Sequence, residues 1–194
     1  MLTSASARAA VLLLGGALVM TACGASAGTA ESSSVSASAT SAGPSPSETN
    51  PYGSAPAVDP PGPNDPVLTI QGADGQQIEL TATQLQALDK QTITIEEPFV
   101  RKQEQFTGVP MSALLALASI PGSATIDTVA LNDYTYTAPA SQFTDSQALV
   151  AYQVDGKEIP LAEGGPVRIV FPTGSAQFSN LDAWNWSLEA IQQK

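Results

Sequence analysis

The chain has one cysteine, Cys23, and no histidine. Every residue after Cys23 must therefore fold without a disulfide, a thiolate or an imidazole. These absences exclude zinc sites built from Cys and His, iron–sulfur clusters, and catalysis by a Cys nucleophile or a Ser-His-Asp triad. A domain built from the remaining residues must rest on its hydrophobic core alone, so it needs enough chain to bury one.

The surroundings of Cys23 indicate export. Residues 9–20 are almost entirely apolar and follow a segment whose one charged side chain is Arg8, which is typical of a signal peptide and too short to span a bilayer well. The run ends in Met20-Thr21-Ala22-Cys23-Gly24. Small residues directly before a cysteine resemble the lipobox of bacterial lipoproteins, although that family usually has Leu where this chain has Met20.

The lipoprotein resemblance implies that residues 1–22 are a signal peptide and that Cys23 carries lipid. Two acyl chains on one residue give stable anchoring. The expected partner is then the membrane, and the expected location is the cell membrane, facing its extracytoplasmic side. In the alternative, an ordinary signal peptide is removed and Cys23 has no role.

The segment after the signal peptide has a linker's composition. Residues 23–64 consist mainly of Ser, Ala, Thr, Gly and Pro, with few large apolar side chains. Such a segment cannot bury enough surface to offset the entropy of ordering it, so we expect a disordered linker that stiffens towards its proline-rich end. Residues 65–194 remain as one domain of 130 residues.

This domain is acidic, with 15 Asp and Glu against 6 Lys and Arg, a net charge of −9. Nucleic-acid binding needs a basic face, so the composition excludes a nucleic-acid partner. Anionic lipid headgroups would also repel the domain, so membrane attachment must come from the anchor.

Local patterns predict an α+β fold, mostly β, with mixed sheets and two or three short helices. Residues 92–95 alternate Thr and Ile, and Asp155-Gly156 is a two-residue hairpin signal. Pro110 precedes residues 111–118, whose Leu and Ala content predicts a buried helix. A second helix is predicted at residues 83–88, and further strands at residues 67–70, 77–80, 105–109, 124–131, 134–138, 148–154, 157–161, 167–171 and 183–191.

Several motifs follow one another in a distinctive order. They are Phe106-Thr107-Gly108-Val109-Pro110, Leu131-Asn132-Asp133-Tyr134, Val154-Asp155-Gly156-Lys157 and Gly164-Gly165-Pro166-Val167-Arg168. This series resembles the molybdopterin-binding domain of the sulfite oxidase family of oxidoreductases, over nearly all of residues 66–192.

In catalytic relatives, the resemblance implies a molybdenum centre held by the pterin dithiolene and by one Cys, which lies before the Gly-Val-Pro motif. Residues 96–106 contain no Cys, and Asp182-Ala183-Trp184 stands where the family typically has a Lys-Trp pair. Soft metal centres select sulfur ligands. We therefore expect no catalytic residue, no metal ligand and no bound cofactor; if the family's activity is retained, the cofactor is molybdopterin.

The candidate pocket consists of Arg168, Arg101 and Tyr134. Arg168 matches the family's Gly-Gly-Pro-x-Arg arginine and would bind a small anion or a carboxylate of a protein partner. In the alternative, Arg168 forms a structural ion pair with a nearby acid.

Three acids, Glu96, Glu97 and Glu104, lie beside Arg101 and Lys102. We interpret them as a solvated loop whose charges balance, with a hard-cation site as the alternative.

Three functions remain open. The first is a lipid-anchored binding or interaction module of sulfite-oxidase-like fold without a cofactor. The second is a molybdopterin-dependent oxidoreductase with an atypical metal site, which rests on the family resemblance alone. The third is a structural lipoprotein of the cell envelope.

Overall fold

The computed structural model describes residues 54–194, which form an α+β domain dominated by strands. The predicted fold class is confirmed. The predicted signal peptide, Cys23 and most of the predicted linker lie outside the described residues. Within residues 54–194, no helix has the length and apolar character needed to cross a membrane.

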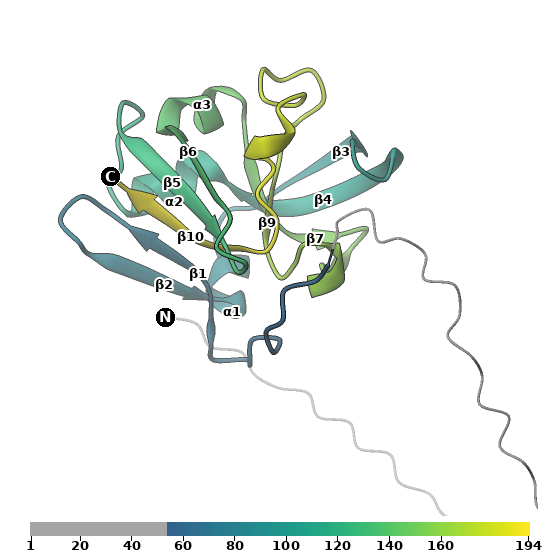
Figure 1. Cartoon of the computed structure of the whole chain (residues 1–194), viewed down its shortest axis with the longest axis horizontal. Coiled ribbons are helices and arrows are strands. Elements are labelled where there is room, and N and C mark those ends of the chain that lie inside the picture. Colours follow the sequence, from purple (N-terminus) through teal and green to yellow (C-terminus); the bar gives the residue numbers. More distant parts are fainter. Residues whose placement is uncertain (1–53) are drawn as a thin grey trace, which may run out of the picture. The chain divides into compact units, whose positions relative to one another are not determined.

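The first sheet contains five strands and is mixed. Its order is β2-β1-β10-β5-β6, in which β1 and β10 run parallel and the other neighbours run antiparallel (Figure 1). The strands are β1 (Pro66–Gln71), β2 (Gln77–Thr81), β5 (Thr125–Ala130), β6 (Thr135–Pro139) and β10 (Leu188–Gln193).

The second sheet has the order β3-β4-β7-β8, and β9 also pairs with β7. The hairpin of β3 and β4 extends away from the rest of the domain in Figure 1. This sheet brings β3 and β9 to either side of β4 and β7, although the two strands are far apart in the sequence. The strands are β3 (Gln91–Glu97), β4 (Lys102–Pro110), β7 (Leu149–Val154), β8 (Lys157–Glu158) and β9 (Arg168–Val170).

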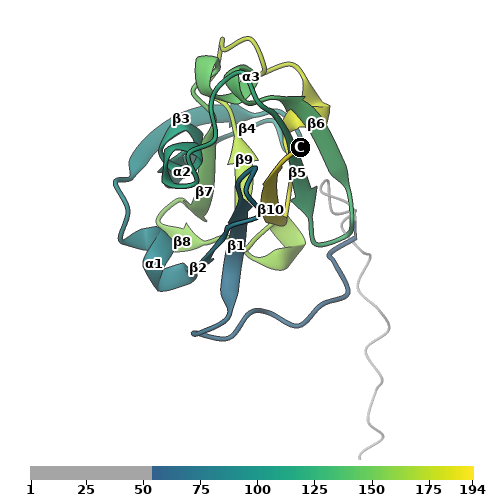
Figure 2. The ribbon, with the colours of Figure 1, turned by 90° about the vertical axis from the view of Figure 1, so that its left-hand side faces the viewer.

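Short helices connect the strands. Thr81 caps α1 through a capping box: its hydroxyl accepts from the Gln84 amide at 3.3 Å, and its own amide donates to the Gln84 side chain at 2.9 Å. In both ribbon views α1 and α3 lie at opposite ends of the domain (Figure 2). The helices are α1 (Ala82–Gln86), α2 (Met111–Leu117), α3 (Ala140–Asp145) and the 3₁₀ turns η1 (Leu161–Glu163) and η2 (Leu181–Ala183).

The close approach of β4 and β7 requires the glycine of the Gly-Val-Pro motif. Gly108 lies on β4 opposite β7, and a Cβ atom on it would collide with the backbone of Val150 and Ala151. The two strands pack closely in the core, where Phe106, Val150 and Ile169 are almost fully buried. Any side chain at position 108 would push these strands apart.

Two strands differ from their predicted ranges by several residues at one end. Residues 183–191 do not form one strand: η2 comes first, and β10 begins only at Leu188. Ser187 has a left-handed backbone, with φ of 50°, so the chain bends just before β10. Residues 157–161 are likewise a strand only over Lys157–Glu158, after which Pro160 leads into η1.

The last part of the predicted linker is described from Ser54 and contains no helix or strand. Asp65 closes a turn in it, because its carboxylate accepts from the Gly62 amide at 2.8 Å and its own amide donates to the Gly62 carbonyl at 3.1 Å. Residues 60–63 line a pocket together with residues of the domain. The residues that pack against the domain therefore begin before residue 65.

Candidate functional site

A buried ion pair joins β3 and β9, the strands on either side of β4 and β7 in the second sheet. Glu97 is the last residue of β3, Arg168 is the first residue of β9, and the exposed fractions of the two residues are 0% and 1%. The Arg168 Nη2 atom lies 2.8 Å from Glu97 Oε1. Its other terminal nitrogen, Nη1, donates to the Glu163 carbonyl at 3.2 Å.

The second carboxylate oxygen of Glu97 is also occupied. It accepts from the amides of Phe99 at 2.7 Å and Val100 at 2.8 Å, which are the first amides of the turn after β3. The carboxylate therefore ties the turn to β9. Charge-assisted hydrogen bonds of this kind are about twice as strong as neutral ones.

Two aromatic rings flank the guanidinium of Arg168. Its central carbon lies 5.5 Å from the ring centre of Phe106 and 5.3 Å from that of Trp186. Such contacts add cation–π attraction to the ion pair in a desolvated position. The positive charge of Arg168 is thus neutralised inside the domain.

A second acid, Glu104, lies close to this pair. Burial raises the pKa of Glu104 above its ordinary value, and the negative charge of Glu97 raises it further, while Lys102 and Arg168 oppose the shift. Lys102 Nζ lies 4.0 Å from Glu104 Oε1, but the Lys102 side chain is 68% exposed and contributes little.

Tyr134 lies elsewhere, at an aromatic hollow of about 230 Å³. Phe99 forms edge-to-face contacts with Trp186 at 4.3 Å and Trp184 at 6.2 Å between ring centres. The Tyr134 hydroxyl donates to the Asp182 carbonyl at 3.0 Å, and burial together with the Asp182 charge raises the pKa of Tyr134. All four aromatic residues line the hollow.

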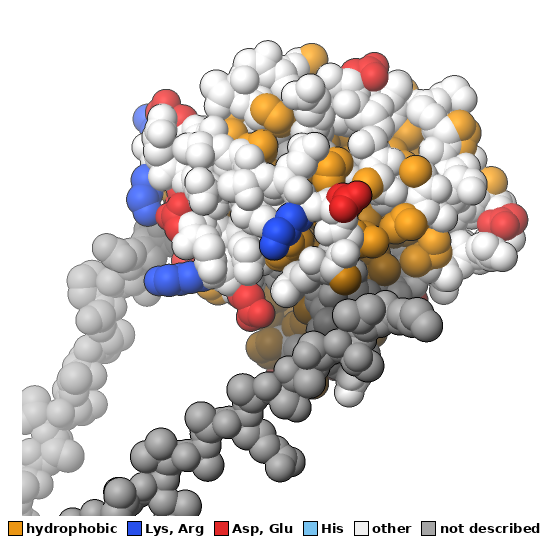
Figure 3. Space-filling model, turned by 180° about the vertical axis from the view of Figure 1, so that it is seen from behind, with side chains coloured by type: hydrophobic (Ala, Val, Ile, Leu, Met, Phe, Trp, Pro, Cys, Tyr) orange, Lys and Arg blue, Asp and Glu red, His pale blue; other side chains and the backbone are white. Residues whose placement is uncertain are grey.

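The hollow has polar groups but no basic side chain. Asn185 donates to the Thr128 carbonyl at 2.7 Å, and its own side-chain oxygen is buried without a hydrogen-bond partner within residues 54–194. Asp182 also lines the hollow. Lys and Arg side chains are also few on the face seen in Figure 3, where most of them lie along the left edge.

The three residues of the predicted pocket do not share one cavity. Arg168 is buried beneath Trp186, Tyr134 lies at the aromatic hollow, and Arg101 is exposed in the turn between β3 and β4 with φ of 54°. Arg168 is set apart from the other two residues because β9 carries it into the core rather than to the surface. Cys23 lies outside the described residues, so its lipid attachment stays a prediction.

Glu97 is the residue that the sequence analysis missed. It was interpreted as part of a solvated loop, but it is fully buried. The alternation of side chains along β3 could have identified Glu97 as buried. Ile95 and Glu97 are two residues apart, so both side chains face inwards. Glu96 points outwards and is exposed, as the loop interpretation expected for all three acids.

The chain is similar to known proteins in both its sequence and its fold. Residues 99–180 match the sequence profile of the family described as "Oxidoreductase molybdopterin binding domain". The predicted resemblance to the molybdopterin-binding domain of the sulfite oxidase family is confirmed. No curated protein matches the chain.

Among solved structures, the domain is similar to the sulfane dehydrogenase SoxCD from Paracoccus pantotrophus, with a TM-score of 0.55 and 17% identity. The match covers 71% of this chain and 40% of that chain, so this chain spans less than half of the enzyme's length. At this identity the likeness shows the fold alone.

The residues present do not fit a molybdenum centre. Glu97 is the buried carboxylate at the end of β3, and both of its oxygens already accept hydrogen bonds. A carboxylate is also a hard ligand, whereas a soft metal selects sulfur. No group of three or more metal-ligating side chains exists within residues 54–194. The aromatic hollow also lacks the cations that would hold an anionic pterin phosphate.

Proposed function

We propose that this chain is a binding module on the sulfite-oxidase-like fold, without a molybdenum cofactor, and that lipid on Cys23 holds it at the extracytoplasmic face of the cell membrane. The ion pair of Glu97 and Arg168 carries the first part of this proposal. Arg168 matches the family's Gly-Gly-Pro-x-Arg arginine, and here its charge is paired with an internal carboxylate.

The pairing has a consequence for ligands. A buried cation that is already compensated gains little by binding an external anion, because the new bond replaces an existing one of similar strength. The small-anion partner expected at Arg168 therefore has no support in the geometry. Binding would instead use concavities such as the aromatic hollow and the pocket around Val67 and Leu85, neither of which is lined by Lys or Arg among residues 54–194.

The test is metal and pterin analysis. The full chain is purified from a molybdenum-replete host that makes active molybdenum enzymes of its own, which serve as the loading control. We expect less than one tenth of an equivalent of molybdenum and of pterin per chain. Stoichiometric amounts of both would overturn the proposal and favour the oxidoreductase alternative, which the family match over residues 99–180 supports.

The anchor is tested separately. The wild-type chain and a Cys23→Ser variant are produced in the same bacterial host with labelled palmitate. We expect label and membrane association in the wild type and the loss of both in the variant. An unlabelled wild type released into the medium would contradict the lipid anchor while leaving the binding function of the domain intact.

A further inference from the structure

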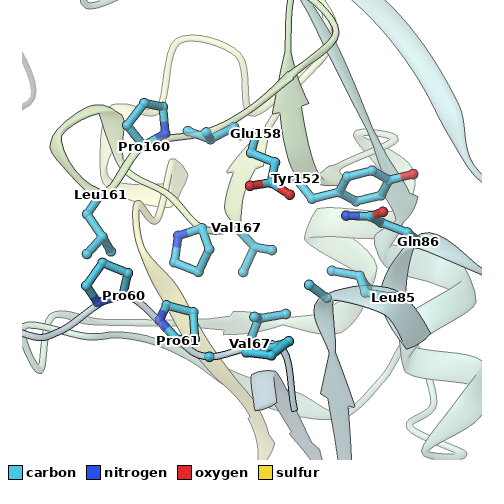
Figure 4. Close-up of a pocket in the computed structure, with 15 residues that line it drawn as sticks. Pro60, Pro61, Val67, Leu85, Gln86, Tyr152, Glu158, Pro160, Leu161 and Val167 are labelled. Atoms are coloured by element: carbon cyan, nitrogen blue, oxygen red, sulfur yellow. The ribbon is translucent and has the colours of Figure 1, made fainter. Parts of the chain in front are cut away.

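A second concavity, a pocket of about 620 Å³, is drawn in Figure 4. It shares no lining residue with the aromatic hollow. Its volume falls in the range typical of small-molecule sites, roughly 300 to 1,000 Å³. Four buried aliphatic residues, from β1, from α1 and from the chain between β8 and β9, line its apolar floor: Val67, Leu85, Ile159 and Val167.

A proline segment supplies one wall. Pro60, Pro61, Gly62 and Pro63, which we call the proline strap, line one side of the pocket, and Figure 4 shows the rings of Pro60 and Pro61 at this wall. The strap is fixed by the two hydrogen bonds between Gly62 and Asp65. Proline rings are apolar and lose little entropy on binding, so the strap suits an apolar ligand.

Polar groups gather at the other end of the pocket. The carboxylate of Glu158 points into it, and the side chains of Tyr152 and Gln86 lie beside each other on the same side (Figure 4). Burial raises the pKa of the Tyr152 hydroxyl, so this group stays neutral at physiological pH. The pocket thus has an apolar end and an end with one negative charge.

The charge of Glu158 is not compensated within the described part of the chain. None of the three ion pairs there involves it, and no Lys or Arg lines the pocket. A carboxylate at the mouth of an apolar cavity repels fatty acids and other anions. It attracts a ligand whose apolar body ends in a cation, and the Tyr152 ring adds a surface for such a cation.

We infer that this pocket binds a small amphiphilic cation, an ammonium group on an apolar body, with the apolar part between the proline strap and the aliphatic floor and the ammonium at Glu158. The inference deepens the proposed binding function by naming its site and its class of ligand. Metal analysis tests that function independently, because it does not depend on any probe.

The experiment compares three probes of one shape and different charge: 3-phenylpropyltrimethylammonium, 4-phenylbutanol and 4-phenylbutyrate. Each is titrated into the ¹⁵N-labelled full chain at physiological salt, where interactions with distant surface charges are screened. We expect amide shifts centred on Val67, Leu85 and Ile159, and an affinity order of cation, neutral alcohol, anion. Equal binding of the cation and the anion, or shifts centred elsewhere, would overturn the inference.

Two variants separate the two ends of the pocket. Glu158→Gln should weaken the cation about three- to five-fold and leave the alcohol unchanged, as expected for an exposed charge pair. Its matched control is Glu189→Gln, which removes the same charge from an exposed position on β10 outside the pocket. An equal loss in both variants would show only general attraction to an acidic domain and would contradict the site.

Asp65→Ala releases the strap without changing a residue that lines the pocket. It should weaken both the cation and the neutral alcohol, whereas Asp59→Ala, an exposed acid upstream of the strap, should weaken neither. Unchanged amide shifts away from the pocket establish that each variant is folded. Full affinity in Asp65→Ala would contradict the role of the strap.

Discussion

Two glutamates at the ends of strands in the same sheet have opposite surroundings. Glu97 ends β3 with no exposure, and its two oxygens contact one guanidinium and two backbone amides. Glu158 ends β8 at the surface, and no cation among residues 54–194 pairs with it. A carboxylate that is fully compensated stabilises the fold, whereas one beside an apolar pocket remains available to a ligand.

The largest effect on stability is expected at Glu97. A Glu97→Gln substitution keeps the shape but leaves the buried charge of Arg168 without its counter-charge, and removing one partner of a buried pair costs about 3–5 kcal/mol. We expect the free energy of unfolding, measured by urea denaturation, to fall by about that amount.

A double variant tests the cause. Glu97→Gln combined with Arg168→Met removes the stranded charge and keeps a side-chain oxygen for the amides of Phe99 and Val100, so the double variant should recover most of the lost stability. The control is Glu96→Gln, at an exposed neighbouring position on β3. A loss of stability in Glu97→Gln no larger than in Glu96→Gln would contradict the role of the pair.

The second prediction concerns Glu104, which lies between the two extremes. Its pKa is raised in the folded state by burial and by Glu97, so ionising it destabilises the fold, and this penalty appears as the pH rises through the raised pKa. Glu104→Gln should therefore raise the melting temperature at pH 7, by about one to three degrees.

The gain from Glu104→Gln should vanish below pH 4, where the carboxyl is protonated in both the folded and the unfolded states. Thermal melts of both proteins across this range provide the measurement. A variant that is less stable than the wild type at pH 7 would mean that attraction to Lys102 and Arg168 outweighs burial at this position.

The smallest effect is expected at Glu158. Glu158→Gln removes an exposed charge that stabilises no partner in the described chain, so the free energy of unfolding should change by less than about 0.5 kcal/mol. The same variant loses affinity for the cationic probe. A large loss of stability would show that Glu158 has a structural role and would erase the contrast with Glu97.

Local signals in the sequence determined much of the fold. The Thr-Ile alternation of residues 92–95 lies within β3, the Asp155-Gly156 pair forms the turn between β7 and β8 with positive φ at both residues, and Pro110 precedes α2. The order of motifs also indicated the family fold, which the comparisons confirm. Each of these features depends on residues that are neighbours in the chain.

The tertiary structure alone decided the partners. Glu97 and Arg168 are 71 residues apart and lie on strands that do not pair with each other, so only the folded chain brings their side chains together. Residues 183–191 were predicted as one strand, but Trp184 and Trp186 lie in irregular chain before β10, where they pack against Phe99 and other rings. The proline strap was expected to be linker, yet it forms the wall of a pocket.

Periodicity records which side of an element a residue faces, and so the sequence contained the inward direction of Glu97. It does not record what lies opposite. The partner of a buried charge is set by the order in which strands pair, and that order depends on contacts spread over the whole domain. For this reason the sequence determined the elements of this protein, and only the folded chain determined its charged centre and its pocket.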